Sequence, residues 1–381
     1  ADSPLFANET CDQSVDQEEI VDFGKREYKK QILRMNKVEP VTPLISPTNV
    51  RHFRIRLMVE HLEVRGWTIV IYDNNFKVVQ TISQDDFGKV KHLWTSRILG
   101  GWGYINVIAK GDQDPKVGID SIISMPKTSR RPFYSTQQPG VQAWKFLYAN
   151  DVEPIYKQWG ANVGLLVTGY KERNWSCTGV MLSRTLFMTN WHCGGHPRLG
   201  IREADMWEPE TGLCENSIVD LSWDEDESSR DYICKAVELP DADLDFVLLR
   251  LVPINMKDTA SGVTLRRTDI IRDQGVVMIH HPLGEAKRIS LDHCSVRDPK
   301  KEGWRKVGDG EFTHTCDTEE GSSGAPVFSK DGILVGLHRA GFQVEKNVCD
   351  RLNKAVRMGP ILGKIHEKRP DLINEIQTES N

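Results

Sequence analysis

The sequence lacks any long hydrophobic run. No stretch approaches the roughly 18 consecutive apolar residues that a membrane-spanning helix needs, so we expect no membrane span. It also lacks an excess of positive charge, since 49 Lys and Arg face 54 Asp and Glu and the formal net charge is −5. This balance gives no basic field for nucleic acid, and we expect no nucleic-acid partner. No internal repeat or low-complexity tract is evident, and 39% hydrophobic residues are ordinary for a globular protein.

Cys-x-x-Cys pairs are missing too, which argues against a zinc ribbon or a thioredoxin-type redox site. The chain nevertheless has eight cysteines, and an even number is typical of proteins that fold in an oxidising compartment. It begins at Ala1 rather than at methionine, which we interpret as the result of signal-peptide removal. We therefore expect a secreted or periplasmic protein with disulfide bonds.

The length of 381 residues and the local patterns predict two folded units. Residues 1–45 are polar and form an N-terminal arm, in which Glu18 to Met35 could be a short helix. Residues 46–125 alternate apolar and polar side chains with period two, as in Phe53, Ile55 and Leu57, and predict a small antiparallel β-sandwich. The module shows no titratable cluster, which favours a packing role. Proline-rich residues 126–154 predict a linker. Residues 155–381 again contain many short strands and end in one or two helical turns after Pro360.

Three segments of the second unit contain candidate catalytic residues. They read Thr-Asn-Trp-His192-Cys, Asp245-Phe-Val-Leu-Leu and Gly321-Ser-Ser323-Gly-Ala-Pro. A serine hydroxyl needs an adjacent base to act as a nucleophile, and a histidine can be that base. A carboxylate entering an apolar run is costly unless it is paired, and such a carboxylate can orient the histidine ring. The glycines allow a sharp bend around Ser323, so that the amides of Gly321 and Ser323 could form an oxyanion hole.

In this order the three segments resemble the TAAHC-type, DIALL-type and GDSGGP-type motifs of trypsin-like (chymotrypsin-fold) serine peptidases. The Gly-x-His segment that ends at His338 makes the chain most similar to bacterial lysyl and glutamyl endopeptidases. The resemblance spans about residues 155–370. It implies an all-β fold, a double six-stranded β-barrel preceded here by the small sandwich. It also implies a serine endopeptidase with the triad His192, Asp245 and Ser323, polypeptide substrates, and neither a metal nor an organic cofactor.

The resemblance also points to the residues of the specificity pocket, which are Asp317, Thr318, His338, Arg339 and Lys354. A lysine at 354 would attract a carboxylate, so we favour cleavage after acidic residues. Asp317 stands where trypsin holds its pocket aspartate, which leaves cleavage after Lys or Arg open. A pair between Asp317 and Lys354 would instead give a neutral pocket. Ser322 stands where trypsin-type enzymes have an aspartate, so activation by that salt bridge is not expected.

The family pattern implies a disulfide between Cys177 and Cys193, around the loop of the catalytic histidine. We expect two further bridges between cysteines that are close in sequence and a fourth between the two that remain, which gives Cys214–Cys234, Cys294–Cys316 and Cys11–Cys349. Two other functions stay open. A catalytically silent protease fold could serve as a binding module, and the same triad could act as an esterase, although no Gly-x-Ser-x-Gly elbow is evident.

Overall fold

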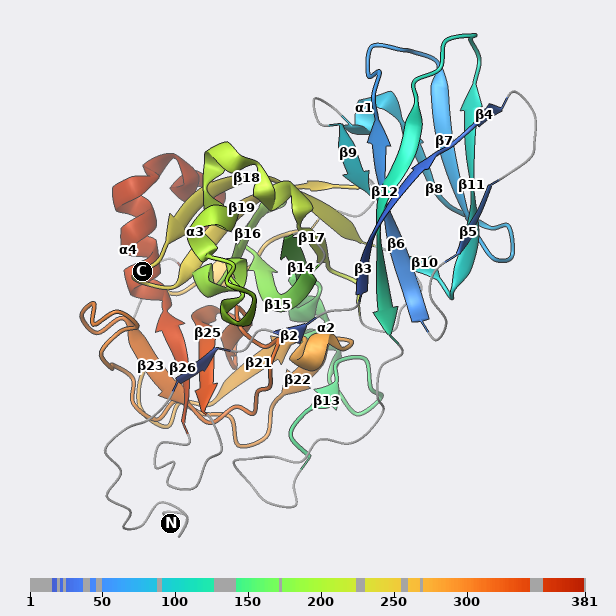
Figure 1. Cartoon of the computed structure of the whole chain (residues 1–381). Helices are drawn as coiled ribbons and strands as arrows, with labels where there is room; N and C mark the ends of the chain where they lie inside the picture. The colour runs from blue at the N-terminus through green and yellow to red at the C-terminus, as the bar shows by residue number, and fades with distance from the viewer. Residues whose placement is uncertain are drawn as a thin grey trace.

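A computed structural model describes residues 16–18, 21–22, 25–36, 42–45, 50–87, 91–126, 142–170, 173–223, 230–254, 260–267, 270–342 and 352–379. Figure 1 shows a β-sandwich beside two packed β-barrels, with the C-terminal helix on the barrel side. The described chain is mostly β, which confirms the all-β fold class. The expected linker falls largely on residues 127–141, outside the described residues.

The N-terminal sandwich consists of two sheets whose apolar faces meet. One sheet is made of β3 (Lys25–Ile32), β6 (Val50–Val59), β9 (His92–Trp94), β10 (Ile98–Leu99) and β12 (Val117–Pro126). The other is made of β4 (Met35–Asn36), β5 (Thr42–Ile45), β7 (Trp67–Asp73), β8 (Val78–Ser83) and β11 (Trp102–Ala109), with the short α1 (Gln84–Phe87) after β8. Phe53, Ile55 and Leu57 are fully buried in the core between the sheets, as their alternation predicts.

The expected helix between Glu18 and Met35 is wrong. Residues 25–32 form β3, which pairs antiparallel with β12, and β4 and β5 pair with β11. Residues 25–45 therefore belong to the sandwich where the structure describes them, and do not form a separate arm. The reason is non-local pairing: the long edge of β12 offers backbone hydrogen bonds that override weak local helix propensity.

The first barrel closes on itself. Its strands are β14 (Val163–Tyr170), β15 (Arg173–Met181), β16 (Leu186–Thr189), β17 (Ile218–Asp220), β18 (Asp231–Asp241) and β19 (Phe246–Pro253), and β14 pairs with both β17 and β15. Antiparallel pairing runs through the whole ring. Between β16 and β17 the chain forms α3 (Glu203–Trp207) and several short 3₁₀ turns. Closure removes exposed strand edges and encloses a continuous apolar core.

The second barrel contains β22 (Arg288–Ser290), β21 (Val276–His280), β24 (Pro326–Ser329), β25 (Leu334–Phe342), β26 (Asn353–Arg357) and β23 (Glu311–His314), paired in this order. A bridge between Val296, which follows β22, and His314 of β23 connects the two ends of the series. The sheet also includes β1 (Asp16–Glu18), β13 (Lys145–Phe146), β20 (Thr264–Leu265) and β27 (Gln377–Thr378). The expected C-terminal helical turns are confirmed as α4 (Met358–Lys368) and a 3₁₀ turn over Pro370–Glu375.

The sandwich is joined to the barrels by a buried charged and aromatic contact. Arg54 of β6 lies 2.6 Å from Asp220 and 2.7 Å from Asp231, which belong to the first barrel. The two carboxylates raise the pKa of Arg54 against the effect of burial, and Arg97 together with Arg54 holds the pKa of Asp220 low although burial raises it. Around them pack Trp94 and Trp223, together with other buried apolar residues of both units. The sandwich therefore packs directly against the first barrel.

A buried lysine ties the two barrels together. Lys287, directly before β22, donates hydrogen bonds to the carbonyl of Gly160 at 2.7 Å and to that of Leu221 at 2.8 Å. Gly160 ends α2 (Pro154–Gly160), and Leu221 follows β17 of the first barrel. The ammonium group is thus enclosed by backbone carbonyls, which offset the cost of its burial.

Candidate functional site

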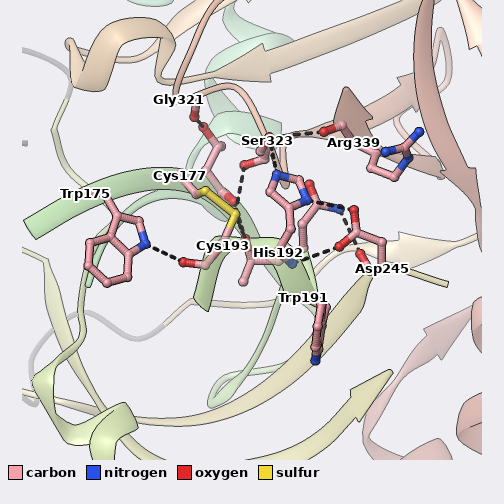
Figure 2. The surroundings of a disulfide bond; sticks show 12 residues. Trp175, Cys177, Trp191, His192, Cys193, Asp245, Gly321, Ser323 and Arg339 are labelled. Atoms are coloured by element: carbon pink, nitrogen blue, oxygen red, sulfur yellow. Dashed lines mark hydrogen bonds and ion pairs between the residues drawn. A yellow bond between two sulfur atoms is a disulfide. The ribbon is translucent and has the colours of Figure 1, made fainter. Parts of the chain in front are cut away.

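The position of His192 is set by a short helical turn and a disulfide. Residues Trp191–Gly194 form a 3₁₀ turn after β16, and the side chain of His192 is fully buried. Cys193 is bridged to Cys177 of β15, which ties this turn to the neighbouring strand. Trp175 donates a hydrogen bond from its indole nitrogen to the Cys193 carbonyl at 2.6 Å. Figure 2 shows the bridge lying next to the histidine.

Asp245 lies at the turn that connects β18 and β19, with a left-handed backbone conformation of φ 52°. Aspartate is among the few non-glycine residues that adopt this conformation readily. The turn is held by Leu244, whose amide donates to the carboxylate of Asp241 at 2.8 Å, and by Asn190, whose side-chain amide donates to the Asp245 carbonyl at 2.9 Å. The carboxylate is thereby aimed at His192 rather than at solvent.

The three side chains of the sequence motifs meet in one hydrogen-bonded line. His192 Nδ1 lies 2.7 Å from Asp245 Oδ2, and His192 Nε2 lies 2.8 Å from Ser323 Oγ. The other carboxylate oxygen accepts the backbone amide of His192 at 2.9 Å. All three side chains are fully buried, and Figure 2 shows the imidazole between the carboxylate and the hydroxyl. With Nδ1 donating to the carboxylate, Nε2 is an acceptor for the serine proton.

The loop around Ser323 depends on two glycines with left-handed backbone, Gly321 (φ 95°) and Gly324 (φ 84°). A side chain at 324 would place its Cβ 2.1 Å from the Thr178 carbonyl, so only glycine fits. The Thr178 hydroxyl donates to the Gly321 carbonyl at 2.9 Å. The loop is therefore anchored to β15 on one side, and the amide of Gly324 anchors it to β25 through the His338 carbonyl at 2.8 Å.

Of the residues expected to line the specificity pocket, His338, Arg339 and Lys354 lie on neighbouring strands of the second barrel, and Asp317 and Thr318 follow β23. His338 and Arg339 are in β25 and Lys354 is in the adjacent β26, where it pairs with Ala340. Thr318 accepts a hydrogen bond from the Asn353 side chain at 3.2 Å, and the Asp317 carbonyl accepts one from Ser290 at 3.0 Å. Asp317, His338 and Lys354 are buried. The Arg339 side chain instead forms an ion pair with Glu311 at 2.8 Å.

His338 is linked to a second buried histidine that the sequence motifs do not single out. His314 Nε2 lies 3.0 Å from His338 Nδ1, and the amide of Cys316 donates to His314 Nδ1 at 3.2 Å. Burial lowers the pKa of His314 well below its ordinary value, and burial, Arg339 and His192 lower the pKa of His338 to about 3. Both rings are therefore neutral near pH 7. His314 then donates from Nε2, which leaves the proton of His338 on its own Nε2.

An aromatic ring also covers the imidazole. Trp304 stacks on His192 with ring centroids 6.2 Å apart and an interplanar angle of 22°. The central carbon of the Arg339 guanidinium, Cζ, lies 4.5 Å from the centroid of the Trp304 ring. Trp304 comes from the segment between β22 and β23, which has no motif of its own, so the sequence alone gave no signal for this contact.

Three of the four expected disulfides lie within the described residues and are present, namely Cys177–Cys193, Cys214–Cys234 and Cys294–Cys316. They indicate an oxidising location. The expected pair Cys11–Cys349 lies outside the described residues. In the part of the chain that the structure describes, no group of three or more His, Cys, Asp or Glu side chains is arranged to hold a metal ion. No helix there is long and apolar enough to cross a membrane.

Comparison with known proteins identifies the class. Residues 177–337, which contain His192, Asp245 and Ser323, match the family model of the trypsin-like peptidase domain. The chain therefore contains a trypsin-like peptidase domain and is a serine endopeptidase, a hydrolase. No curated protein matches the sequence.

Solved structures with a similar fold include the active form of the Rv3671c protease from M. tuberculosis, at 16% identity and a TM-score of 0.43 over 66% of this chain and 97% of that one. A Glu endopeptidase is similar at 14% identity and a TM-score of 0.40, over 60% of this chain and 96% of the other. Deg5 is similar at 16% identity and a TM-score of 0.41, over 59% and 94%. These scores are low, so the assignment of the class rests on the family model.

Proposed function

We propose that the chain hydrolyses peptide bonds with Ser323 as nucleophile, His192 as general base and acid, and Asp245 as the group that orients His192. The observation that carries this proposal is the continuous line of contacts from Asp245 through His192 to Ser323, with distances of 2.7 and 2.8 Å. His192 takes the proton of Ser323 as its oxygen attacks the substrate carbonyl, and returns it to the leaving amine. Water then hydrolyses the acyl-enzyme ester by the same route.

The developing negative charge of the substrate oxygen needs donors, and we assign this role to the amides of Gly321 and Ser323. The left-handed backbone at Gly321 and Gly324 supports this assignment because it bends the chain tightly around the nucleophile. The contact of Thr178 with the Gly321 carbonyl supports it further, since it fixes the orientation of the loop. A preorganised loop loses no energy to reorientation when the oxyanion forms.

For specificity we favour an acidic residue before the cleaved bond. Lys354 is a buried cation on the strand next to β25, and the histidine pair leaves the Nε2 of His338 as a proton donor. Thr318 accepts a hydrogen bond from the Asn353 side chain, which fixes the position of its hydroxyl group beside β26. A cation and neutral donors together match the charge and the lone pairs of a carboxylate. The buried Asp317 favours the alternative, cleavage after Lys or Arg, and a pair of Asp317 with Lys354 would make the pocket neutral.

The location follows from the same chemistry. Three disulfides need an oxidising compartment to form. We propose that the protein is secreted or periplasmic.

Active-site labelling separates an endopeptidase from a silent binding module. A fluorophosphonate probe should label the wild-type chain and leave Ser323→Ala unlabelled, while thermal unfolding shows both folded. A peptide library should be cleaved by wild type, and the Ser323→Ala rate should fall by on the order of 10⁴–10⁶. Absence of labelling in folded wild type would favour the binding module, and cleavage of esters without peptides would favour an esterase.

A further inference from the structure

Two short strands near the N-terminus pair with edges of different barrels. Strand β1 pairs antiparallel with the end of β25, so that Gln17 lies opposite Gly341 and Glu18 lies opposite Ala340. Strand β2 (Val21–Asp22) pairs antiparallel with β15 of the first barrel. The chain near its N-terminus is therefore attached to both barrels.

The edge of β25 that holds β1 begins at the nucleophile. The carbonyl of Arg339 accepts a hydrogen bond from Ser323 Oγ at 3.1 Å, and Ala340 follows directly. Residues two apart on a strand direct their backbone groups to the same edge. The amide and the carbonyl of Gly341 therefore face the same side as the Arg339 carbonyl, and Gln17 stands opposite them. Gln17 is thus the residue whose backbone amide donates to β25.

A polypeptide substrate needs this same edge. Its carbonyl must come within reach of Ser323 Oγ, and an extended peptide binds a strand edge by adding a strand through backbone hydrogen bonds. The edge of β25 next to Ser323 runs from Arg339 over residues 340–342, and β1 covers the last three of these residues. A substrate and β1 therefore compete for one set of backbone donors and acceptors.

We propose that β1 is an intramolecular competitive inhibitor of the active site, which must leave the edge of β25 before a polypeptide substrate can bind; this inference rests on the proposed function. Strand β1 pairs over only three residues, at the short end of the range for strands, so few hydrogen bonds break on its release. Strand β2 pairs with Trp175 and Ser176 and follows closely in sequence. This pairing tethers β1 near its binding edge, so the blocked state forms again.

Competition of this kind has a defined kinetic signature. When only a fraction of the molecules has an open edge, the apparent affinity for substrate falls by that fraction, and the bound complex reacts at its normal rate. The pairing of β1 therefore raises KM for a polypeptide substrate and leaves kcat unchanged. A strand that only supports the fold would not produce this split between the two constants.

The test compares wild type with Gln17→Pro in the full chain, with one library peptide as substrate. Proline has no amide hydrogen, so the variant loses the hydrogen bond from residue 17 to β25. One such bond corresponds to a factor of about two to ten in an equilibrium, so KM should fall by this factor while kcat stays the same. Thermal unfolding of both proteins checks that the barrels remain folded.

Glu18→Pro is the matched control. Neighbouring residues of a strand direct their backbone groups to opposite edges, so the amide of Glu18 faces away from β25 and its removal breaks no hydrogen bond to that strand. KM of this variant should stay within about twofold of wild type. An unchanged KM in Gln17→Pro, or an equal fall of KM in both variants, would overturn the proposal.

Hydrogen exchange of residues 16–18 measures the displacement directly. A peptidyl phosphonate that modifies Ser323 and pairs with β25 should remove β1 from the edge, so the amide of Gln17 should lose its protection. A fluorophosphonate without a peptide modifies the same serine and should leave this protection in place. Protection that persists beside the bound peptide would mean that β1 and a substrate use different surfaces.

Failure of the proposal differs from failure of the proposed function. A wild-type chain that reacts with the fluorophosphonate probe and cleaves peptides with the same KM as Gln17→Pro contradicts only the inhibitory role of β1. A chain that neither reacts with the probe nor cleaves any peptide contradicts the endopeptidase mechanism, and the inhibitory role falls with it.

Discussion

Ser322 Oγ lies 2.7 Å from His280 Nδ1, with both side chains buried next to the nucleophile loop. The other ring nitrogen of His280 lies 3.0 Å from the Ser290 hydroxyl. The position before Ser323 is therefore filled by a neutral hydrogen-bonded chain, in place of a carboxylate that needs a cationic partner. Burial holds the pKa of His280 well below its ordinary value, which keeps the chain uncharged. The loop can thus be ordered without an ion pair to a new N-terminus.

Asp245→Asn should lower kcat/KM for a library peptide by on the order of 10⁴, because an amide favours the wrong tautomer of His192. Asparagine tolerates the left-handed backbone at this position, so the unfolding temperature should change little. The exposed neighbour Asp243 provides the control, and Asp243→Asn should leave kcat/KM unchanged. A large loss in both variants would assign the effect to the turn and not to the carboxylate.

Lys354→Asp should depress cleavage after glutamate and aspartate and admit lysine or arginine, since it reverses the charge of a buried pocket residue. Wild type and variant are profiled on one peptide library. The control is Lys330→Asp, at an exposed lysine after β24, which should keep the wild-type profile. A wild-type preference for Lys or Arg would show that Asp317 governs the pocket.

Stability should fall as the pH drops below about 6.5, the ordinary histidine pKa. The folded chain lowers the pKa of His281 and His338 to about 3 and that of His280 and His314 below its usual range, mainly by burial. The unfolded chain therefore binds more protons in this window, and each histidine costs up to about 1.4 kcal/mol per pH unit. Above pH 7 this effect vanishes.

Chemical unfolding between pH 5.5 and 8 measures this slope. His314→Gln should lower the number of protons taken up on unfolding by about one, because the variant lacks one histidine whose pKa is lowered in the folded chain. A slope that is the same in wild type and in His314→Gln would contradict the assignment of these protons to the buried histidines.

Arg54→Met should destabilise the protein by about 3–5 kcal/mol, because Asp231 and Asp220 lose their buried ion pairs with Arg54, although Arg97 remains 3.3 Å from Asp220. Arg65 lies 3.7 Å from Asp85 in an exposed pair, and Arg65→Met should change the free energy of unfolding by about 0.5 kcal/mol or less. Urea unfolding measures both. Equal stability of the two variants would mean that the sandwich contact does not depend on this charge.

The period-two patterns predicted the strands well, because alternation reflects which face of a strand meets the core. Residues 53–59 and 67–72 form β6 and β7 as expected. The pattern gives no sign that Arg54 is buried, since that face of β6 packs on the first barrel. The alternation within one strand therefore does not show whether its polar face packs on a second unit. The expected helix over residues 18–35 failed for a related reason, since its outcome depended on the distant edge of β12.

At the site, His192, Asp245 and Ser323 could be found from sequence because each lies in a short segment whose local chemistry is distinctive. The structure brings their side chains within hydrogen-bond distance. His314 and Trp304 could not be found in this way. Their contacts with His338 and His192 depend on the register of β23, β26 and β25 and on the path of a long loop, which no local motif encodes.

The enclosed ammonium group of Lys287 can be used to measure separation of the two barrels. Its nitrogen donates to the carbonyls of Gly160 and Leu221 and is shielded from solvent. An acylating reagent that modifies surface amines can react with the Lys287 nitrogen only when α2 and the two barrels have moved apart. The rate at which Lys287 acquires such a tag thus reports how often the two barrels separate, independently of catalysis.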